Sequence, residues 1–276
     1  MTEEFIQITG KEDGSTSVVL VGVHGDEVCG VRALELLLPT LEIERGTVFF
    51  GYGNPRAIEK RVRYAEQNLN RMFKDDSDLS DEEKMSYEYK RAQYIRKYLD
   101  RADALLDIHA SFTPDSQPFI ICENNATGIT ECLPLDVAVS GFDAIQPGGT
   151  DYYMNSIGKI GICVECGYFN DPQSTMRAQE SILAFLASRD HLVYTVTSRV
   201  QSTIRMNSMY ITQSDQFRLA RQFYDFEDLS EGEIVGVDGV NEIRVEKNSI
   251  ILFARDRNKK GDEAFLLGEK VRGPTK

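Results

Sequence analysis

Apolar and polar positions alternate in blocks along the first 195 residues, and each block indicates its element. Runs rich in Val, Ile and Leu predict buried strands at residues 17–24, 46–53, 102–111 and 160–167. Amphipathic segments predict helices at residues 27–38, 80–101 and 172–190. In the second of these helices, Ser80 is expected as the N-cap and Glu83 completes a capping box. This alternation predicts an α/β fold, a mixed, largely parallel sheet with helices on both faces.

The pattern changes after about residue 195. Residues 231–256 consist of short β-branched runs separated by Glu-Gly, Asp-Gly and Lys-Asn turn signals. They predict a small all-β domain at the C-terminus, built as a barrel or a sandwich. We therefore expect two domains, residues 1–195 and residues 196–276, with the boundary between Val193 and Arg199.

The net charge of the chain excludes some classes of binding partner. The chain of 276 residues has a formal net charge of −13, and the whole acidic excess lies before residue 196. Such a surface repels nucleic acid and anionic membranes, so we expect neither as a partner. No apolar run approaches the roughly 20 residues that span a bilayer. The acidic N-terminus lacks the features of a signal peptide, which favours a cytoplasmic protein.

The five cysteines are too sparse to indicate a disulfide scaffold. Cys163 and Cys166 form a C-x-x-C spacing, but no second pair accompanies them and they lie within a predicted strand. We interpret them as buried thiols, with a redox or metal role as the alternative.

Chemically active side chains occur at the ends of predicted strands, where ligands bind in open α/β sheets. His24 and Glu27 follow the first strand, His109 ends another, and Glu165 lies near the end of a third. Two imidazoles and a carboxylate form a set that leaves tetrahedral zinc one open position. Asp107 shares a strand face with His109 and is expected to orient its ring.

Chance is the alternative explanation, because His-x-x-Glu and Asp-x-His spacings are common when taken singly. The third histidine, His191, follows a predicted helix and is expected to be structural. A second signal is basic: residues 60–73 gather Lys60, Arg61, Arg63 and Arg71 in the acidic part of the chain. Arginine suits recognition of carboxylates and stabilisation of an oxyanion, although surface charge is the simpler explanation for each residue alone.

Four motifs carry a family resemblance. "HGDE", "RYAEQNLNRMF", "DIHAS" and "VECG" follow one another at the approximate spacing of the succinylglutamate desuccinylase/aspartoacylase family. That family is a branch of the zinc carboxypeptidase fold, and its members resemble this chain also in having a C-terminal β-domain. The resemblance implies that residues 1–195 form a zinc hydrolase domain in which His24, Glu27 and His109 bind one zinc ion.

The resemblance also implies roles for four other residues. Glu165 matches the general base, which would activate a zinc-bound water as the nucleophile. Arg63 matches the arginine that polarises the scissile carbonyl. Asn70 and Arg71 match the pair that grips a substrate carboxylate. The expected activity is hydrolysis of the amide bond of a small N-acyl amino acid or a related amide.

One position departs from the family pattern. Aspartate-cleaving members have a further arginine about ten residues before the general base, which reads the acyl group's carboxylate. This chain has Asn155 at that place and Lys159 nearby. The sequence therefore does not identify the acyl group or the amine of the substrate. The β-domain of family members also supplies a tyrosine, for which Tyr210 is a candidate.

Two other functions compete with the deacylase. A zinc carboxypeptidase would use the same metal and would grip the C-terminal carboxylate of a short peptide with Asn70 and Arg71. A silent metal-binding module would lack a ligand or the general base, whereas all of them are present in the sequence. The residues leave the oligomeric state open, a homo-oligomer included.

Overall fold

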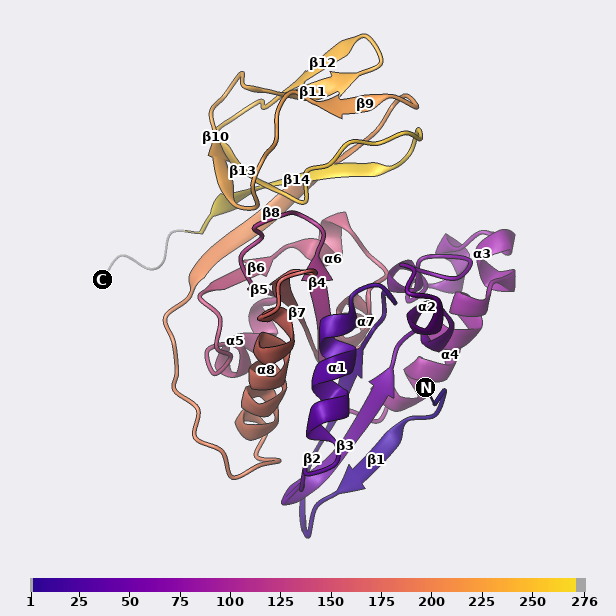
Figure 1. The fold of residues 1–276 in the computed structure, drawn as a ribbon, viewed down its shortest axis with the longest axis vertical. Helices are drawn as coiled ribbons and strands as arrows, with labels where there is room; N and C mark the ends of the chain where they lie inside the picture. The colour runs from indigo at the N-terminus through magenta and orange to yellow at the C-terminus, as the bar shows by residue number, and fades with distance from the viewer. Residues whose placement is uncertain (1, 272–276) are drawn as a thin grey trace.

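The computed structural model describes residues 2–271. Within them a large sheet contains eleven strands (Figure 1). In spatial order these are β1 (Ile6–Thr9), β3 (Arg45–Tyr52), β2 (Glu12–Val21), β4 (Ala104–Ser111), β7 (Ile160–Tyr168), β5 (Phe119–Cys122), β6 (Val137–Ser140), β8 (Ser202–Ile211), β14 (Glu263–Lys270), β13 (Ser249–Leu252) and β10 (Glu227–Leu229). Strands β3, β2, β4 and β7 run parallel, whereas β1 and β5 pair antiparallel with their neighbours β3 and β7. The prediction of a mixed, largely parallel sheet, made for the first 195 residues, is confirmed.

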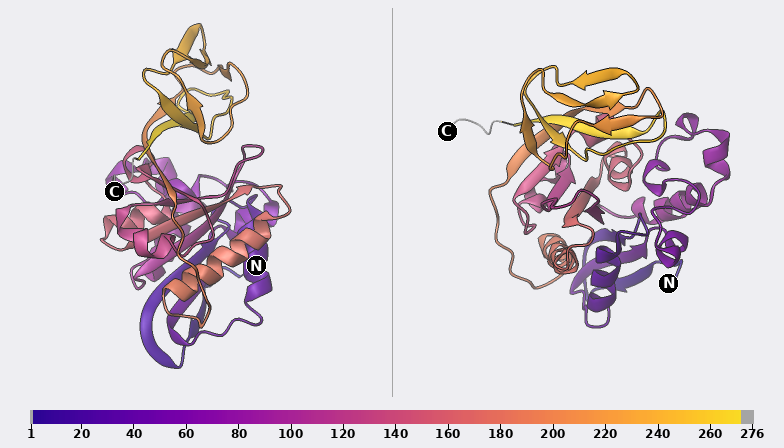
Figure 2. Two further views of the ribbon diagram at one scale, coloured as in Figure 1. Left: turned by 90° about the vertical axis from the view of Figure 1, so that its left-hand side faces the viewer. Right: turned by 45° about the horizontal axis from the view of Figure 1, so that its top comes forward.

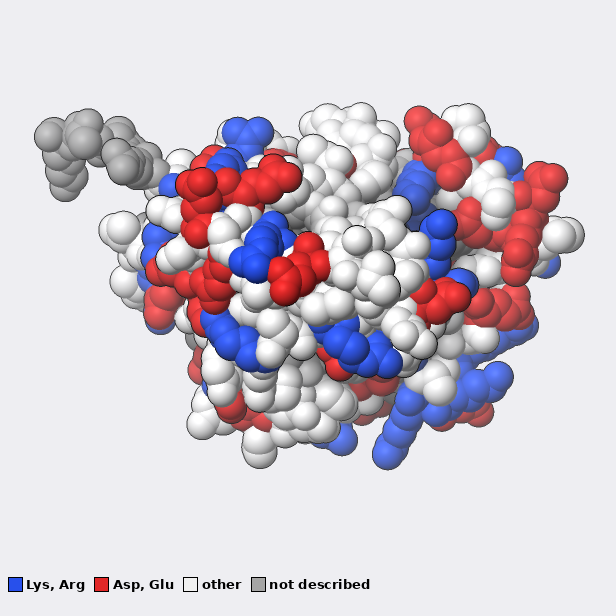
Figure 3. Space-filling view, turned by 90° about the horizontal axis from the view of Figure 1, so that it is seen from above, with Lys and Arg blue, Asp and Glu red and all other residues white. Residues whose placement is uncertain are grey.

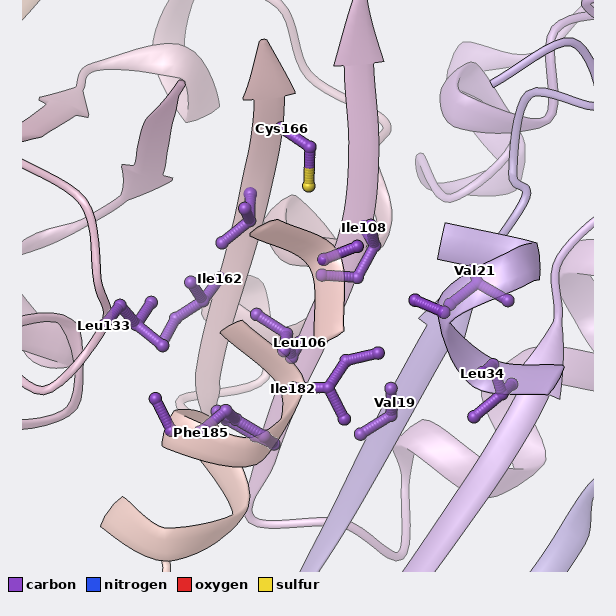
Figure 4. Close-up of a cluster of buried hydrophobic side chains, with 14 of the residues drawn as sticks. Val19, Val21, Leu34, Leu106, Ile108, Leu133, Ile162, Cys166, Ile182 and Phe185 are labelled. Carbon is purple, nitrogen blue, oxygen red and sulfur yellow. The ribbon is translucent and has the colours of Figure 1, made fainter. Parts of the chain in front are cut away.

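Helices cover both faces of this sheet. Helices α1 (Val28–Leu37) and α8 (Ser174–Ser188) pack on one face. Figure 4 shows Ile182 and Phe185 of α8 against Leu106 of β4. Helices α4 (Tyr87–Leu99) and α7 (Thr150–Ser156) pack on the other face, against alternate residues of the same strands. The central strands are buried on both sides, which is why their sequences read as continuous apolar runs.

The remaining helices are short and lie in the connections. They are α2 (Pro55–Lys60), α3 (Asp81–Met85), α5 (Thr127–Thr130) and α6 (Phe142–Ile145), with 3₁₀ turns at η1 (Leu69–Arg71), η2 (Asp76–Asp78) and η3 (Asn124–Ala126). No helix among residues 2–271 combines the length and apolar character needed to cross a membrane.

The helix predicted over residues 80–101 is two helices, and that prediction is wrong in this respect. Ser80 and Glu83 form the expected capping box at the start of α3. The backbone then becomes extended at Ser86 (φ −67°, ψ 160°), whose side chain caps α4 by accepting from Tyr89 N at 3.1 Å. A serine has almost the same helical propensity as its neighbours, so the sequence pattern did not reveal this second cap.

The C-terminal segment is all-β, as predicted, and through one of its strands it also continues the large sheet. Strand β8 pairs with β6, so the large sheet continues across the expected boundary (Figure 1). Strands β9 (Phe217–Leu219), β11 (Ile234–Asp238) and β12 (Asn241–Arg244) form a separate three-stranded antiparallel sheet. An apolar cluster that includes Phe217, Val235 and Ile251 lies between this sheet and the end of the large one. The two sheets therefore pack against each other, and the end of the large sheet forms one of the two layers.

Seen from the side, the C-terminal strands project from one end of the helix-covered sheet (Figure 2). Figure 3 views the molecule from that end, where acidic and basic side chains are interspersed. The division at residues 195/196 falls in the extended segment between α8 and β8, and two separate domains remain a prediction.

Candidate functional site

A tight turn after β2 delivers the first two candidate ligands. The strand ends at Val21, three residues before the predicted strand end at His24, because Gly22 adopts a positive φ of 66°. Gly25 packs so closely on α2 that a Cβ there would lie 2.1 Å from the carbonyl carbon of Ala57. The glycines therefore let the backbone bend sharply against α2 before α1 begins, with His24 and Glu27 buried in the turn.

The side chains of His24, Glu27 and His109 converge. Glu27 Oε1 lies 2.8 Å from His24 Nδ1, and Glu27 Oε2 lies 2.9 Å from His109 Nδ1. One candidate ligand atom from each residue lies within 4.8 Å of the others. Arg63 Nη1 also donates to Glu27 Oε1 at 2.9 Å. Two imidazoles and one carboxylate thus lie close enough together to hold a metal ion.

The second nitrogen of each imidazole faces an oxygen. His24 Nε2 lies 3.0 Å from Asn68 Oδ1. His109 Nε2 lies 3.2 Å from Asp107 Oδ2, close enough for an ion pair but outside hydrogen-bond geometry. Outer contacts of this kind fix the orientation of metal-binding histidines. Sequence reasoning identified Asp107 but missed Asn68, although it lies in the same motif as Asn70.

The electrostatics of this cluster favour a shared cation. Burial and the charge of Arg63 lower the pKa of His24 to about 4, which keeps this ring neutral. Burial opposes ionisation of Glu27, but the two imidazoles outweigh it and hold the pKa of Glu27 well below its usual range. Burial likewise opposes a charge on His109, but Asp107 outweighs it and raises the pKa of that ring. His24 and Glu27 are thus in the forms that bind metals, a neutral imidazole and an ionised carboxylate, whereas His109 has to release its proton when a metal binds.

Glu165 lies beside these residues on the neighbouring strand. His109 of β4 and Glu165 of β7 are direct register partners, so their side chains share one face of the sheet. Glu165 Oε2 is buried without a hydrogen-bond partner. Burial and the charge of Glu27 raise the pKa of Glu165 to about 8. A carboxyl group with a pKa near neutrality can both accept and donate a proton.

The basic motif forms a loop that a buried carboxylate holds in place. Glu88 of α4 is fully buried and accepts from the backbone N–H groups of residues 65, 66 and 67 at 2.7, 3.2 and 3.0 Å. Asn54 donates to it as well, at 3.0 Å. Arg63, just before these anchored residues, and Asn70 and Arg71, just after them, line the pocket.

Arg71 is engaged by the C-terminal segment. Its Nε and Nη2 donate to the carboxylate of Glu263 on β14 at 2.9 to 3.2 Å, and its Nη1 donates to the carbonyl of Asn70 at 2.7 Å. Gln146 donates to the same carboxylate at 2.6 Å. The ion pair therefore links the loop of the basic motif to the C-terminal strands.

One pocket, of about 950 Å³ including space open to solvent, contains all of the predicted site residues. They are His24, Glu27, Arg63, Asn70, Arg71, His109 and Glu165. Other lining residues are apolar, among them Phe142, Met209 and Phe253. Asp143, Asp151 and Arg255 also line it and were not identified from the sequence. The volume and the mixture of apolar walls and few polar groups suit a small molecule.

Three other candidates lie outside the residues that line this pocket. Lys159 donates to the carbonyls of residues 99 and 100, at 3.3 and 2.6 Å. Asn155 donates to Asp143 at 3.0 Å, and the Tyr210 hydroxyl donates to Asp238 at 2.8 Å. Neither Asn155 nor Lys159 therefore brings a positive charge to the pocket.

The remaining sequence candidates have structural surroundings. Cys163 and Cys166 are buried free thiols, and Cys163 borders the pocket. His191 is fully buried and contacts Arg45 and Ser17 away from the pocket.

Comparison with known proteins identifies the class to which this fold and site belong. Residues 13–189 match the family model of the succinylglutamate desuccinylase/aspartoacylase catalytic domain. The chain belongs to this family, and the predicted resemblance is confirmed.

Similar proteins include an aspartoacylase from Xenopus tropicalis, 36% identical over 104 residues that cover 32% of this chain and 31% of the relative. An N-acyl-aromatic-L-amino acid amidohydrolase (carboxylate-forming) from the same species is 30% identical over 179 residues, 59% of this chain and 57% of the relative. Both alignments thus span less than two thirds of the relative. The crystal structure of succinylglutamate desuccinylase from Vibrio parahaemolyticus shares the fold, with a TM-score of 0.78 at 15% identity over 94% of this chain and 82% of that one.

Proposed function

We propose that this protein is a zinc-dependent hydrolase that cleaves the amide bond of a small N-acyl amino acid. The observation that carries the proposal is the convergence of His24, Glu27 and His109 beside the unpartnered carboxyl group of Glu165, within one pocket. Family membership supports it, since relatives are named as an aspartoacylase, an amidohydrolase and a desuccinylase.

The residues present fit zinc. His24 and His109 would hold the ion through Nδ1 and Glu27 through its carboxylate, because these atoms already face one another. Three protein ligands of this type are typical of catalytic zinc sites. When bound, zinc supplies Lewis-acid chemistry, which polarises a carbonyl and makes water more acidic.

Glu165 would move the protons. Its Oε2 accepts a proton from the water that attacks the amide carbonyl carbon and later donates that proton to the nitrogen of the leaving amine. The C–N bond breaks, and the products are a carboxylic acid and a free amine. The raised pKa of Glu165, about 8, suits both transfers near neutral pH.

Arg63 would stabilise the negative charge that develops on the carbonyl oxygen. Its guanidinium lies beside the ligand cluster and over the ring of Phe112, 5.0 Å from the ring centroid. Loss of one such donor typically costs about 3 kcal/mol of transition-state stabilisation. Asn70 would orient the substrate from the neighbouring loop through a buried Oδ1 that has no partner, whereas most donors of Arg71 are held by Glu263 and the Asn70 carbonyl.

Two acidic residues of the pocket disfavour a second carboxylate on the substrate. Asp143 and Asp151 line the pocket, and burial raises the pKa of both, that of Asp143 to about 6. A further negative charge there would be repelled and poorly solvated. We therefore propose a neutral acyl group, such as acetyl or formyl, and not succinyl.

A screen of the zinc-loaded enzyme tests the function. Amine release is followed with N-acetyl, N-formyl and N-succinyl amino acids, with dipeptides assayed in parallel. We expect turnover of the N-acetyl or N-formyl compounds and its loss on chelation. Turnover confined to peptides would instead favour a carboxypeptidase.

The role of Glu165 has its own test. We expect Glu165→Gln to lower kcat by about 100- to 10,000-fold. Zinc content, measured by atomic absorption, stays at the wild-type level because Glu165 is not a proposed ligand. A metal-loaded Glu165→Gln with unaltered turnover would remove this residue from the mechanism.

A further inference from the structure

Arg255 is a guanidinium without a partner inside the pocket. It lies between β13 and β14, in the C-terminal segment, and lines the cavity. Its Nε is buried and has no hydrogen-bond acceptor. Among the described residues, no carboxylate forms an ion pair with it within 4.0 Å. The side chain as a whole is half-buried, and a buried donor without a partner calls for an explanation, of which a bound ligand is one.

The surrounding charges make the region of Arg255 positive. Burial and the charges of Arg257, Arg63 and Arg71 outweigh the opposing charge of Glu263 and lower the pKa of Arg255 to about 10, so the group is still protonated at neutral pH. Arg63 and Arg71 are each paired with an internal carboxylate, those of Glu27 and Glu263. Of the three arginines that line the pocket, Arg255 is therefore the one that forms no ion pair within the described residues.

Arg71, the family's carboxylate-binding position, has little capacity left for a ligand. Its Nε and Nη2 are directed at Glu263, and Nη1 donates to the Asn70 carbonyl. A substrate carboxylate would have to displace Glu263, which Gln146 also holds. Arg255 can bind the same group without breaking any hydrogen bond of its side chain.

The backbone around Arg255 is rigidly placed. Arg255 N donates to the carbonyl of Ala264 on β14 at 3.0 Å. The next residue, Asp256, accepts from Leu219 N at 2.8 Å. Ordering this side chain on binding therefore costs less than ordering one on a free loop.

We propose that Arg255 is a specificity-determining residue that binds the carboxylate of the amino-acid part of the substrate. This inference rests on the proposed function, because it assigns that substrate's carboxylate. The planar fork of an arginine matches a carboxylate with two parallel hydrogen bonds. The C-terminal segment would thereby supply a recognition group to a site whose proposed metal ligands and general base come from the first 165 residues.

Binding to an inactive enzyme tests the proposal without requiring turnover. Calorimetry with zinc-loaded Glu165→Gln compares N-acetyl-L-phenylalanine with its neutral amide, N-acetyl-L-phenylalaninamide. We expect the carboxylate to bind more tightly than the amide. Adding Arg255→Gln should weaken binding of the carboxylate about 10- to 100-fold and leave that of the amide within about twofold.

Two further variants distinguish specific binding of the carboxylate by Arg255 from a general effect of positive charge. Arg255→Lys keeps the charge but loses the fork, and should restore only part of the affinity. Lys260→Gln removes an exposed charge from the same segment and should change neither ligand's affinity. Circular dichroism and the melting temperature confirm that each variant is folded.

Equal affinity of the two ligands for Glu165→Gln, or an equal loss for both on Arg255→Gln, would overturn the proposal. The proposed function fails in a different experiment, if no N-acyl amino acid is turned over by the wild-type enzyme. A binding preference that depends on Arg255 would survive that failure.

Discussion

At the scale of single residues, Asn68 contributes through the orientation of His24. Its Oδ1 faces His24 Nε2 at 3.0 Å and also accepts from Asn70 N at 3.0 Å. If His24 binds zinc through Nδ1, Asn68→Ala frees the ring to rotate and should weaken zinc affinity about 10- to 100-fold. Competition with a chromophoric chelator measures this. Asn170→Ala, at an exposed position, is the control and should leave the affinity unchanged.

A side chain at position 25 would clash with the backbone of α2, which lies very close to Gly25. A Cβ at this position would lie 2.1 Å from the carbonyl carbon of Ala57 and 2.3 Å from Ile58 N, so α2 would have to move. We expect Gly25→Ala to lower the free energy of unfolding by about 1–3 kcal/mol, measured by urea denaturation. Gly128, in helix α5, has open space around its missing Cβ. Gly128→Ala should be neutral or stabilising by up to about 1 kcal/mol, and equal effects of the two changes would contradict the steric argument.

At the scale of elements, the break between α3 and α4 has a consequence for the site. Because α4 starts at Tyr87, Glu88 lies in its first turn and its carboxylate reaches the backbone of residues 65–67. A helix continuing through Ser86 would not present this side chain in the same direction. The short interruption thus anchors the loop that carries Arg63, Asn70 and Arg71.

Replacing Glu88 tests this anchoring. Glu88→Gln turns one acceptor into a donor that faces backbone N–H groups, which leaves buried donors without partners. We expect the free energy of unfolding to fall by about 1–3 kcal/mol, and the proposed hydrolase activity to fall as the loop loses its fixed position. Glu59→Gln, which removes an exposed carboxylate from α2, should change stability by less than about 0.5 kcal/mol. Equal stability of Glu88→Gln and wild type would show that the loop is held by other contacts.

At the scale of the whole molecule, His191 connects the exit of α8 to the first two parallel strands. Its Nδ1 donates to the carbonyl of Arg45, and its Nε2 accepts from Ser17 Oγ, both at 2.8 Å. Burial lowers the pKa of His191 below 6.5, so the folded protein favours the neutral ring. Below about pH 6.5 the unfolded chain therefore binds more protons at His191 than the folded protein does. The stabilisation that the neutral His191 gives to the folded state is complete above that pH and is lost as the pH falls below it.

A pH series of unfolding measurements checks this linkage. His191→Gln should lower the free energy of unfolding by about 1–3 kcal/mol at pH 8. The difference from wild type should then shrink as the pH falls from about 6.5 towards 5, since the wild-type stabilisation disappears there. His24 and His109 are present in both proteins, so their titration largely cancels. A difference that is independent of pH would contradict the argument.

The sequence by itself determined the order of the central strands and the long helices, together with the motif residues of the site. Burial on both faces makes the central strands continuously apolar, and helix amphipathicity is equally local, so both are legible without a structure. His24 and His109 stood out because each lies at or near the end of a predicted buried strand, where ligands bind in open α/β sheets. The four motifs were recognisable because they are short and contiguous.

Only the tertiary structure decided how distant segments meet. The pairing of Arg71 with Glu263 joins residues 192 positions apart, and no local pattern specifies it. The same holds for Arg255 in the pocket and for β8, which extends the main sheet where a separate domain was expected. The periodicity of apolar residues shows which side of a helix or strand is buried, but not which segment covers it. The residues that meet across the pocket can therefore be identified only from the folded structure.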